Sequence, residues 1–269
     1  MQYHTSIIMA VLCALGNLAV LLGHPSSASA GATIIGTVTY YGQPQEESYP
    51  TSKNPEKDYC ATLVSKKPAL FRNDGELRVV QTLQVRPDGA LKDAIVAVQD
   101  IVDQTFVTTY PGTEVRIEEC TFLPYTTAVV DKRNFHVVNL DPADHAVAQT
   151  ISHNPHGTEV IGLASRTLFN IALAVKGAEI NKTISLRQVQ HGSAVRLVCD
   201  QHAYMQAWFL PVTNAYFGTT GSEGTFEIKN VPQGRHVLKA WHPKAGMMDV
   251  DVVVPESGQV RVNIEIPKK

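Results

Sequence analysis

The stretch SAVRLVCDQHAYMQAW, residues 193–208, decides the fold class of this chain. Its first half is a short apolar run with the period of two that is typical of a strand with a buried face. A second apolar run follows Met205, so Cys199, His202 and Met205 lie in a tight loop between two predicted strands. Side chains in such a loop can point to one place, whereas successive residues of a continuous strand face opposite ways.

The same strand pattern recurs along the rest of the chain, with the runs bounded by Gly, Pro, Asn and Asp. The other runs are TIIGTVTYYGQP (33–44), AIVAVQDI (94–101), FHVVNLDPADHAV (135–147) and LFNIALAV (168–175). Helical periodicity is confined to the N-terminal segment. We therefore predict an all-β fold, in which the polar, turn-rich residues 44–74 form a long loop or an irregular hairpin.

The N-terminal segment has the features of a secretory signal peptide. Residues 7–23 form an apolar run, and an Ala-x-Ala cleavage site ends at Ala30. We therefore expect residues 1–30 to be removed, leaving a periplasmic or secreted protein with no membrane span. Only His4 and the α-amino group can carry positive charge in front of the apolar run, so an uncleaved anchor is the alternative.

Three cysteines remain after this cleavage, Cys60, Cys120 and Cys199. An odd number in an oxidising compartment leaves one thiol for another task, and Cys199 is the one with metal-like spacing. We predict a disulfide between Cys60 and Cys120. Two unrelated free thiols are the alternative.

Charge and motifs exclude several classes of function. The formal net charge is -2 with Lys and Arg scattered among Asp and Glu, so there is no basic stripe for nucleic acid. Paired carboxylates, a nucleophile elbow and a Gly-rich phosphate loop are all missing from the sequence, which argues against the common hydrolases. We expect the protein not to be an enzyme.

The loop after residue 198 supplies ligands that suit copper. A copper ion that exchanges one electron binds a thiolate, two imidazoles and a weak axial thioether. Cys199, His202 and Met205 provide three of these, and His145, after the turn at Asp141, can provide the second imidazole. Zinc seldom uses Met, and the sequence has no Cys-x-x-Cys-His for covalent haem. The cofactor that we predict is copper.

This arrangement resembles the type 1 blue copper proteins, the cupredoxins, over roughly residues 115–215. Cys-x-x-His-x-x-Met is similar to the amicyanin-type ligand loop, and Asn139, Asp141 and His145 precede it in family order. The resemblance implies a Greek-key β-sandwich, with Cys199, His145 and His202 around copper and Met205 axial. Many members have Asn directly after the first His, whereas His145 is followed by Ala146. By contrast, His153 and His156 in SHNPHG are expected in a solvated turn.

The C-terminal part resembles the carboxypeptidase regulatory-like domains, which are small transthyretin-like β-sandwiches. The residues that carry this resemblance are the Gly224-x-Phe226-x-Ile228 strand, the Val231-Pro232-x-Gly234 turn and the strand from His236, with GTVTY from Gly36 and LKDAIVAV from Leu91 as matching earlier strands.

We therefore expect three parts after the signal peptide. They are an N-terminal β region over 31–112, a cupredoxin-like domain over 113–217 and a regulatory-like β region over 218–269. If the first and third parts share one sandwich, the cupredoxin-like domain is an insertion in it. Tandem domains in chain order are the alternative.

The pairing of these two modules resembles bacterial secreted proteins called methylamine-utilisation or plastocyanin-like. The resemblance implies one-electron transfer with a periplasmic redox partner such as a c-type cytochrome. His202 would lie nearest to solvent, in an apolar docking patch with Ala203, Tyr204 and Trp208. A copper chaperone or store, and an adhesion or scaffold module without metal, are the alternatives.

Overall fold

A computed structural model describes residues 31–53, 60, 63, 67–141, 152–189 and 192–268. The predicted signal peptide and His145 lie outside the described residues.

The described chain is built almost entirely of strands, which confirms the all-β prediction. The strands are β1 (Ala32–Thr39), β2 (Gln45–Pro50), β3 (Phe71–Arg72), β4 (Leu77–Leu83), β5 (Ile95–Val98), β6 (Thr113–Glu118), β7 (Thr121–Leu123), β8 (Thr126–Val129), β9 (Asn134–Asn139), β10 (Pro155–Ile161), β11 (Ala164–Asn170), β12 (Glu179–Thr183), β13 (Ser193–Cys199), β14 (Gln206–Pro211), β15 (Phe217–Thr219), β16 (Thr225–Val231), β17 (Gly234–His242), β18 (Gly246–Val254), β19 (Gln259–Arg261) and β20 (Ile264–Glu265).

The helical elements whose bounds the structure describes are short. They are α2 (Gln104–Thr109) and 3-10 turns at Thr51–Lys53, Pro68–Leu70 and Asn73–Gly75. The Asp103 side chain caps α2 by accepting a 3.0 Å hydrogen bond from the Phe106 amide. A helix of six residues is too short to show a periodic pattern in the sequence. Within the described part of the chain, no helix has the length and apolar character needed to cross a membrane.

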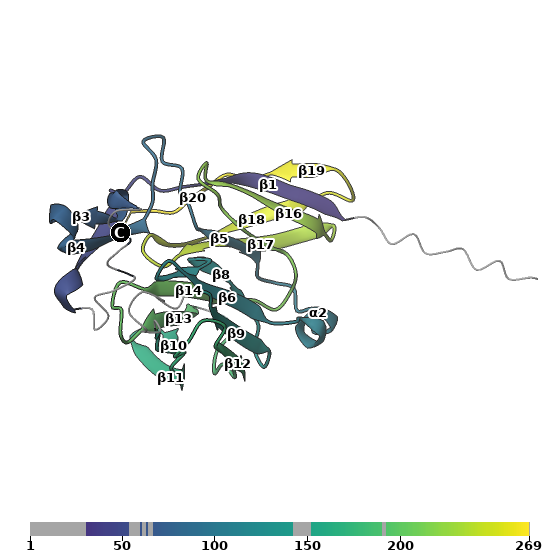
Figure 1. Ribbon diagram of the computed structural model, residues 1–269. Helices are drawn as coiled ribbons and strands as arrows, with labels where there is room; N and C mark the ends of the chain where they lie inside the picture. The colour runs from purple at the N-terminus through teal and green to yellow at the C-terminus, as the bar shows by residue number, and fades with distance from the viewer. Residues whose placement is uncertain are drawn as a thin grey trace, which may run out of the picture.

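Two sheets enclose the core of the sandwich that lies lower in Figure 1, called the lower sandwich. One has the strand order β11-β10-β13-β14-β8, and the other has the order β12-β9-β6-β7. Phe122, Phe135 and Phe209 are fully buried between them, and the Phe135 and Phe209 rings meet edge to face at 4.9 Å between centroids. Each such ring contributes roughly 1.5–3 kcal/mol through burial. This core fixes the ends of β10 and β13, where the candidate site lies.

The N-terminal and C-terminal parts of the chain share an upper sandwich. Its sheets are β16-β1-β19, with β20 also pairing with β1, and β15-β5-β17-β18. Gly36 is needed in β1, because a Cβ atom there would lie 1.7 Å from the Val262 carbonyl oxygen. Two runs from the N-terminal part pair with strands from beyond residue 216. They are GTVTY in β1 and AIVAV around β5. A transthyretin-like identity for this sandwich stays a prediction.

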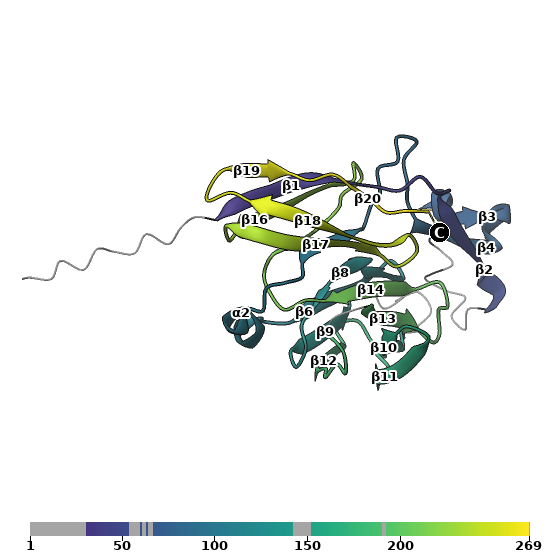
Figure 2. The same cartoon turned by 180° about the vertical axis from the view of Figure 1, so that it is seen from behind.

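The two sandwiches lie one above the other (Figures 1 and 2). A small cluster of buried side chains joins the β5 sheet to the β8 and β14 edge below it, and it consists of Ile95, Ala97, Ala128, Val130, Leu210 and Val212. These buried apolar contacts hold the two sandwiches together.

A fifth sheet, β2-β4-β3, lies to one side of the two sandwiches. β2 pairs with β4 from Gln45↔Leu83 to Pro50↔Leu77 and forms with it the β2–β4 hairpin, whose second strand lies beyond the predicted loop or irregular hairpin at residues 44–74. Phe71 and Leu63 of this region are buried in the core of the lower sandwich. The predicted Cys60–Cys120 disulfide is confirmed and ties this region to the end of β6.

Candidate metal centre

Cys199 is the last residue of β13, and its thiol is buried. The chain turns directly after it: the His202 amide donates to the Cys199 carbonyl at 3.3 Å, and the Met205 amide donates to the His202 carbonyl at 2.8 Å. The Cys199 amide in turn donates to the Met205 carbonyl at 3.3 Å. The predicted tight loop between two strands is therefore present, and it buries Cys199, His202 and Met205 together.

His153 reaches the same place from the neighbouring strand. β10 pairs antiparallel with β13 so that Pro155 lies opposite Cys199, and His153 comes two residues earlier. The intervening Asn154 amide donates to Cys199 Sγ at 3.4 Å, while the Asp200 amide donates to the Asn154 carbonyl at 3.0 Å. These two hydrogen bonds hold the start of β10 against the Cys199 turn.

The donor atoms of His153, Cys199 and His202 converge. One ligand atom from each lies within 4.8 Å of the others, and all three side chains are buried. Cys199 Sγ and His202 Nδ1 are 3.5 Å apart. For zinc, bonds of about 2.3 Å to sulfur and about 2.0 Å to nitrogen, set at the tetrahedral angle of about 109°, would separate these donors by about 3.5 Å. The spacing therefore fits one transition-metal ion between them.

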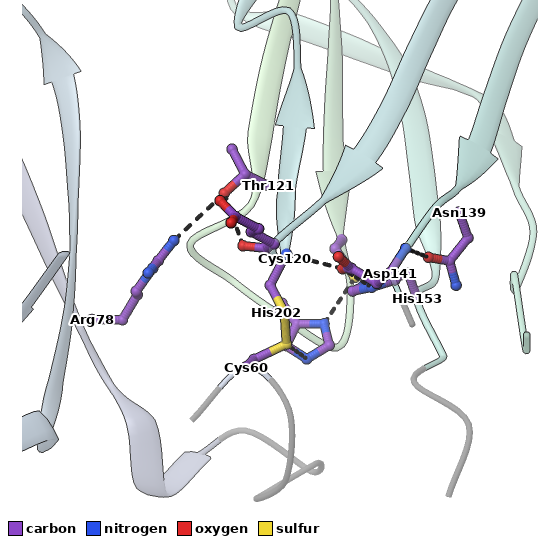
Figure 3. Close-up of a disulfide and its surroundings, with 10 residues drawn as sticks. Cys60, Arg78, Cys120, Thr121, Asn139, Asp141, His153 and His202 are labelled. Atoms are coloured by element: carbon purple, nitrogen blue, oxygen red, sulfur yellow. Dashed lines mark hydrogen bonds and ion pairs between the residues drawn. A yellow bond between two sulfur atoms is a disulfide. The ribbon is translucent and has the colours of Figure 1, made fainter. Parts of the chain in front are cut away.

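A buried carboxylate orients His153. His153 Nε2 lies 3.0 Å from Asp141 Oδ2, which also accepts a 2.9 Å hydrogen bond from the Cys120 amide. Figure 3 shows this chain of contacts beside the disulfide, with Asn139 Oδ1 accepting from the Asp141 amide at 3.1 Å. If His153 donates through Nε2 to Asp141, its Nδ1 offers a lone pair.

That second ring nitrogen has no hydrogen-bond partner among the described residues, although it is buried. A buried nitrogen without a partner costs stability unless something else binds it. The orphaned Nδ1 is thus the atom that a metal ion would satisfy. Cys120, Asp141 and His153 also lie close together, but Cys120 is in the disulfide and offers no thiolate.

The electrostatics favour a charged thiolate. Burial would raise the pKa of the Cys199 thiol, but the neighbouring His153 and His202 outweigh it and lower the pKa to about 6. Burial would likewise lower the pKa of His153, but the contacts with Asp141 and Cys199 raise it to about 9. A thiolate is the form of cysteine that binds metal.

His202 is covered, in contrast to the expectation that it lies nearest to solvent. Its side chain is fully buried, and its Nε2 lies 3.8 Å from Cys60 Sγ of the disulfide. Tyr204, expected in the same exposed patch, is also buried, with its ring 5.7 Å from that of His202. The expected exposure of His202 and Tyr204 is wrong, because the disulfide and the β2–β4 hairpin cover them, whereas Ala203 is exposed and Trp208 is half-buried.

The residues predicted as ligands have different outcomes. Cys199 and His202 come together, and Met205 lies buried in the same loop. His145 lies outside the described residues, so its role as a ligand stays a prediction. The expectation of a solvated turn at His153 is wrong, because its side chain is fully buried between Asp141 and Cys199.

One signal in the sequence could have identified His153. It is followed directly by Asn154, the pattern of the first histidine in many cupredoxins, whereas His145 is followed by Ala146. The second histidine of SHNPHG, His156, does lie near the surface, where it contacts Asp200 and Thr167.

Comparison with known proteins gives only partial structural likenesses. No protein-family model and no curated protein matches the sequence. A purple cupredoxin from Nitrosopumilus maritimus is similar over 36% of this chain and 97% of its own, at 11% identity and a TM-score of 0.27.

Two further structures show likenesses of the same size. A reduced tryptophan-to-tyrosine variant of amicyanin is similar over 43% of this chain and 96% of its own, at 13% identity and a TM-score of 0.26. A copper-containing nitrite reductase from Thermus scotoductus is similar over 36% of this chain and 21% of its own, at 14% identity and a TM-score of 0.27. Support for a metal centre therefore comes from the site's own side chains.

Proposed function

We propose that this protein binds one copper ion through His153, Cys199 and His202, with the Met205 thioether as a weaker fourth ligand, and that it carries single electrons. The observation that supports this most is the convergence of a buried thiol and two buried imidazoles, one with an orphaned nitrogen. A thiolate, two imidazoles and a thioether are the set that suits a copper ion exchanging one electron. In this proposal, His153 replaces His145 in the ligand set predicted from the sequence.

The protein's own residues prepare the site for the ion. Asp141 holds the His153 ring so that Nδ1 faces Cys199, and the Asn154 amide donates to the sulfur. The turn from Cys199 to Met205 fixes His202 at 3.5 Å from that sulfur. Because these groups are already oriented, the site would change little when the charge of the ion changes, which suits electron transfer.

Burial favours a carrier over a copper chaperone. Cys199 is 2% exposed, and His153 and His202 are both 0% exposed. A chaperone must pass its ion to a partner, which needs ligands that another protein can reach. Ligands enclosed by β10, the loop and the disulfide would instead retain the ion.

A scaffold without metal is disfavoured by the same site. Such a module would gain nothing from a buried thiol beside a histidine nitrogen that has no partner, because an apolar pair would be more stable there. Four protein ligands would also leave no open position for a substrate, so we propose a carrier and not an enzyme.

The compartment and the partner belong to the same proposal. The Cys60–Cys120 disulfide is typical of proteins in oxidising compartments, which agrees with a periplasmic or secreted location. A periplasmic one-electron protein such as a c-type cytochrome would be the partner.

The test is to add Cu²⁺ to the purified protein and to record the visible absorption spectrum, together with that of Cys199→Ser. We expect an intense thiolate-to-copper charge-transfer band in the wild type that is lost in the variant, because oxygen replaces the sulfur. Metal content is measured in parallel. A wild type that takes up copper without this band would contradict the proposal.

A further inference from the structure

A cavity of about 670 Å³ lies between the β2–β4 hairpin and the lower sandwich. Its walls come from the hairpin, from the segment around β7 and from Tyr204, Met205 and Gln206. Its volume is in the range of sites for small organic molecules. The copper site proposed above does not use this space, although two residues of the ligand loop line it.

The charged side chains in the cavity wall are paired, with one exception. Lys67 pairs with Glu119, and Lys92 pairs with Asp93 at 3.3 Å. Glu118 pairs with Arg116 at 3.3 Å. Among the described residues, none of the ion pairs includes Arg78, although it is 4% exposed.

The guanidinium of Arg78 has free hydrogen-bond donors. Its Nη2 donates to Thr121 Oγ1 at a long 3.5 Å, a contact that Figure 3 shows as a dashed line. Its Nε and Nη1 are buried and have no acceptor within the described part of the chain. The Glu119 carboxylate acts on Arg78 through space but pairs with Lys67. A buried cation without a hydrogen-bonded anion is costly, so such a group indicates that an anion belongs beside it.

Aromatic stacking explains only part of this arrangement. The guanidinium carbon lies 5.0 Å from the Phe71 ring centroid and 5.3 Å from that of Tyr204. These contacts use the faces of the guanidinium and stabilise its charge. They leave the in-plane N–H groups to other partners, and one edge of a guanidinium can donate two parallel hydrogen bonds to a carboxylate.

The remaining wall is largely apolar. Leu70, Phe122, Leu123, Pro124 and Tyr125 line it together with Tyr204. A ligand that suits both the Arg78 guanidinium and the apolar wall carries one anionic group and a flat apolar body. We propose that this cavity binds a small aromatic monocarboxylate, with its carboxylate on the Arg78 guanidinium and its ring against the wall between the hairpin and the ligand loop.

The test measures binding of benzoate by calorimetry, on protein prepared without copper. We expect saturable binding of benzoate and at least about tenfold weaker binding of benzyl alcohol, because only the carboxylate pairs with Arg78. Arg78→Met should weaken benzoate binding by a similar factor, whereas Arg261→Met, which removes an exposed cation from β19, should leave it unchanged. Inorganic phosphate is the third probe.

Three results would overturn the proposal: no saturable benzoate binding, equal binding of benzoate and benzyl alcohol, or phosphate that binds and displaces benzoate at equal concentration. Displacement of benzoate by phosphate would show that the cavity binds anions without using the aromatic ring. If Arg78→Met does not fold, Gln84→Trp gives a second test, because Gln84 lines the cavity from an exposed position. The bulky indole should block benzoate and leave Arg78 in place, and undiminished binding would contradict the proposal.

This test is independent of the copper proposal, because it uses protein without metal. Benzoate binding should also persist in Cys199→Ser, which removes the thiolate. The two proposals can therefore fail separately. If both proposals hold, benzoate should shift the visible absorption band of the copper-loaded protein, since Tyr204 and Met205 line the cavity and also belong to the ligand loop.

Discussion

The imidazole of His202 faces the Cys60–Cys120 disulfide, with its Nε2 3.8 Å from Cys60 Sγ. The ring edge that points away from Cys199 is therefore covered by a crosslink whose two halves are 60 residues apart. Access to the candidate centre depends on this cover as well as on the ligand loop.

Removing the disulfide should open the centre. In the double variant Cys60→Ser, Cys120→Ser, we expect faster loss of bound copper to a chelator, because the cover of His202 is no longer tied down. We also expect the free energy of unfolding to fall by roughly 2–5 kcal/mol, from loss of the crosslink. Stopped-flow chelation and denaturant unfolding measure these two effects. Copper release at the wild-type rate would show that the disulfide has only a structural role.

Replacing the two candidate histidines separately decides the ligand set. His153→Ala should abolish the charge-transfer band and strongly reduce copper affinity, because it removes the nitrogen beside Cys199. His145→Ala should leave the band nearly unchanged and is the matched control. The reverse result would restore the ligand set that the sequence favoured and would exclude His153.

The sequence was sufficient for those features that depend on local pattern. The period of two and the Cys-x-x-His-x-x-Met turn predicted β13, β14 and the loop that brings Cys199 and His202 together. The odd number of cysteines, with only Cys199 in metal-like spacing, predicted the disulfide. Each of these follows from residues close in sequence or from simple counting.

The features that the sequence did not reveal depend on distant contacts. SHNPHG is as polar as an exposed turn, and its composition does not show that Asp141 and the Leu173 backbone enclose His153. The burial of His202 comes from Cys60, 142 positions earlier in the chain. Local composition predicted exposure in both places, and tertiary packing reversed it.

Asp141 should influence copper binding without touching the ion. Asp141→Asn removes the charge that orients His153 through Nε2, so copper affinity should fall by about 10–100-fold. Competition with a chelator of known affinity measures the change. Asp200→Asn is the control, because Asp200 is exposed and contacts His156 and Asn170 instead. Equal effects of the two substitutions would mean that Asp141 acts only through general electrostatics.

Titration of the protein without copper should reveal the thiolate. The pKa of Cys199 falls from 9.0 to about 6, so its contribution to stability is complete above pH 9 and is lost as the pH falls through 6. The pKa of His153 rises from 6.5 to about 9, so its contribution is complete below pH 6.5 and is lost as the pH rises through 9.

The two contributions have opposite slopes between these limits, so the free energy of unfolding should change little from pH 6.5 to 9. The ultraviolet absorbance of the thiolate should nevertheless appear with a midpoint near pH 6. In His153→Ala the midpoint should move toward that of an ordinary thiol, because the largest of the influences that lower the pKa, the neighbouring His153, is gone. A wild-type midpoint near pH 9 would show that the buried site holds a neutral thiol, and copper binding would then have to release that proton.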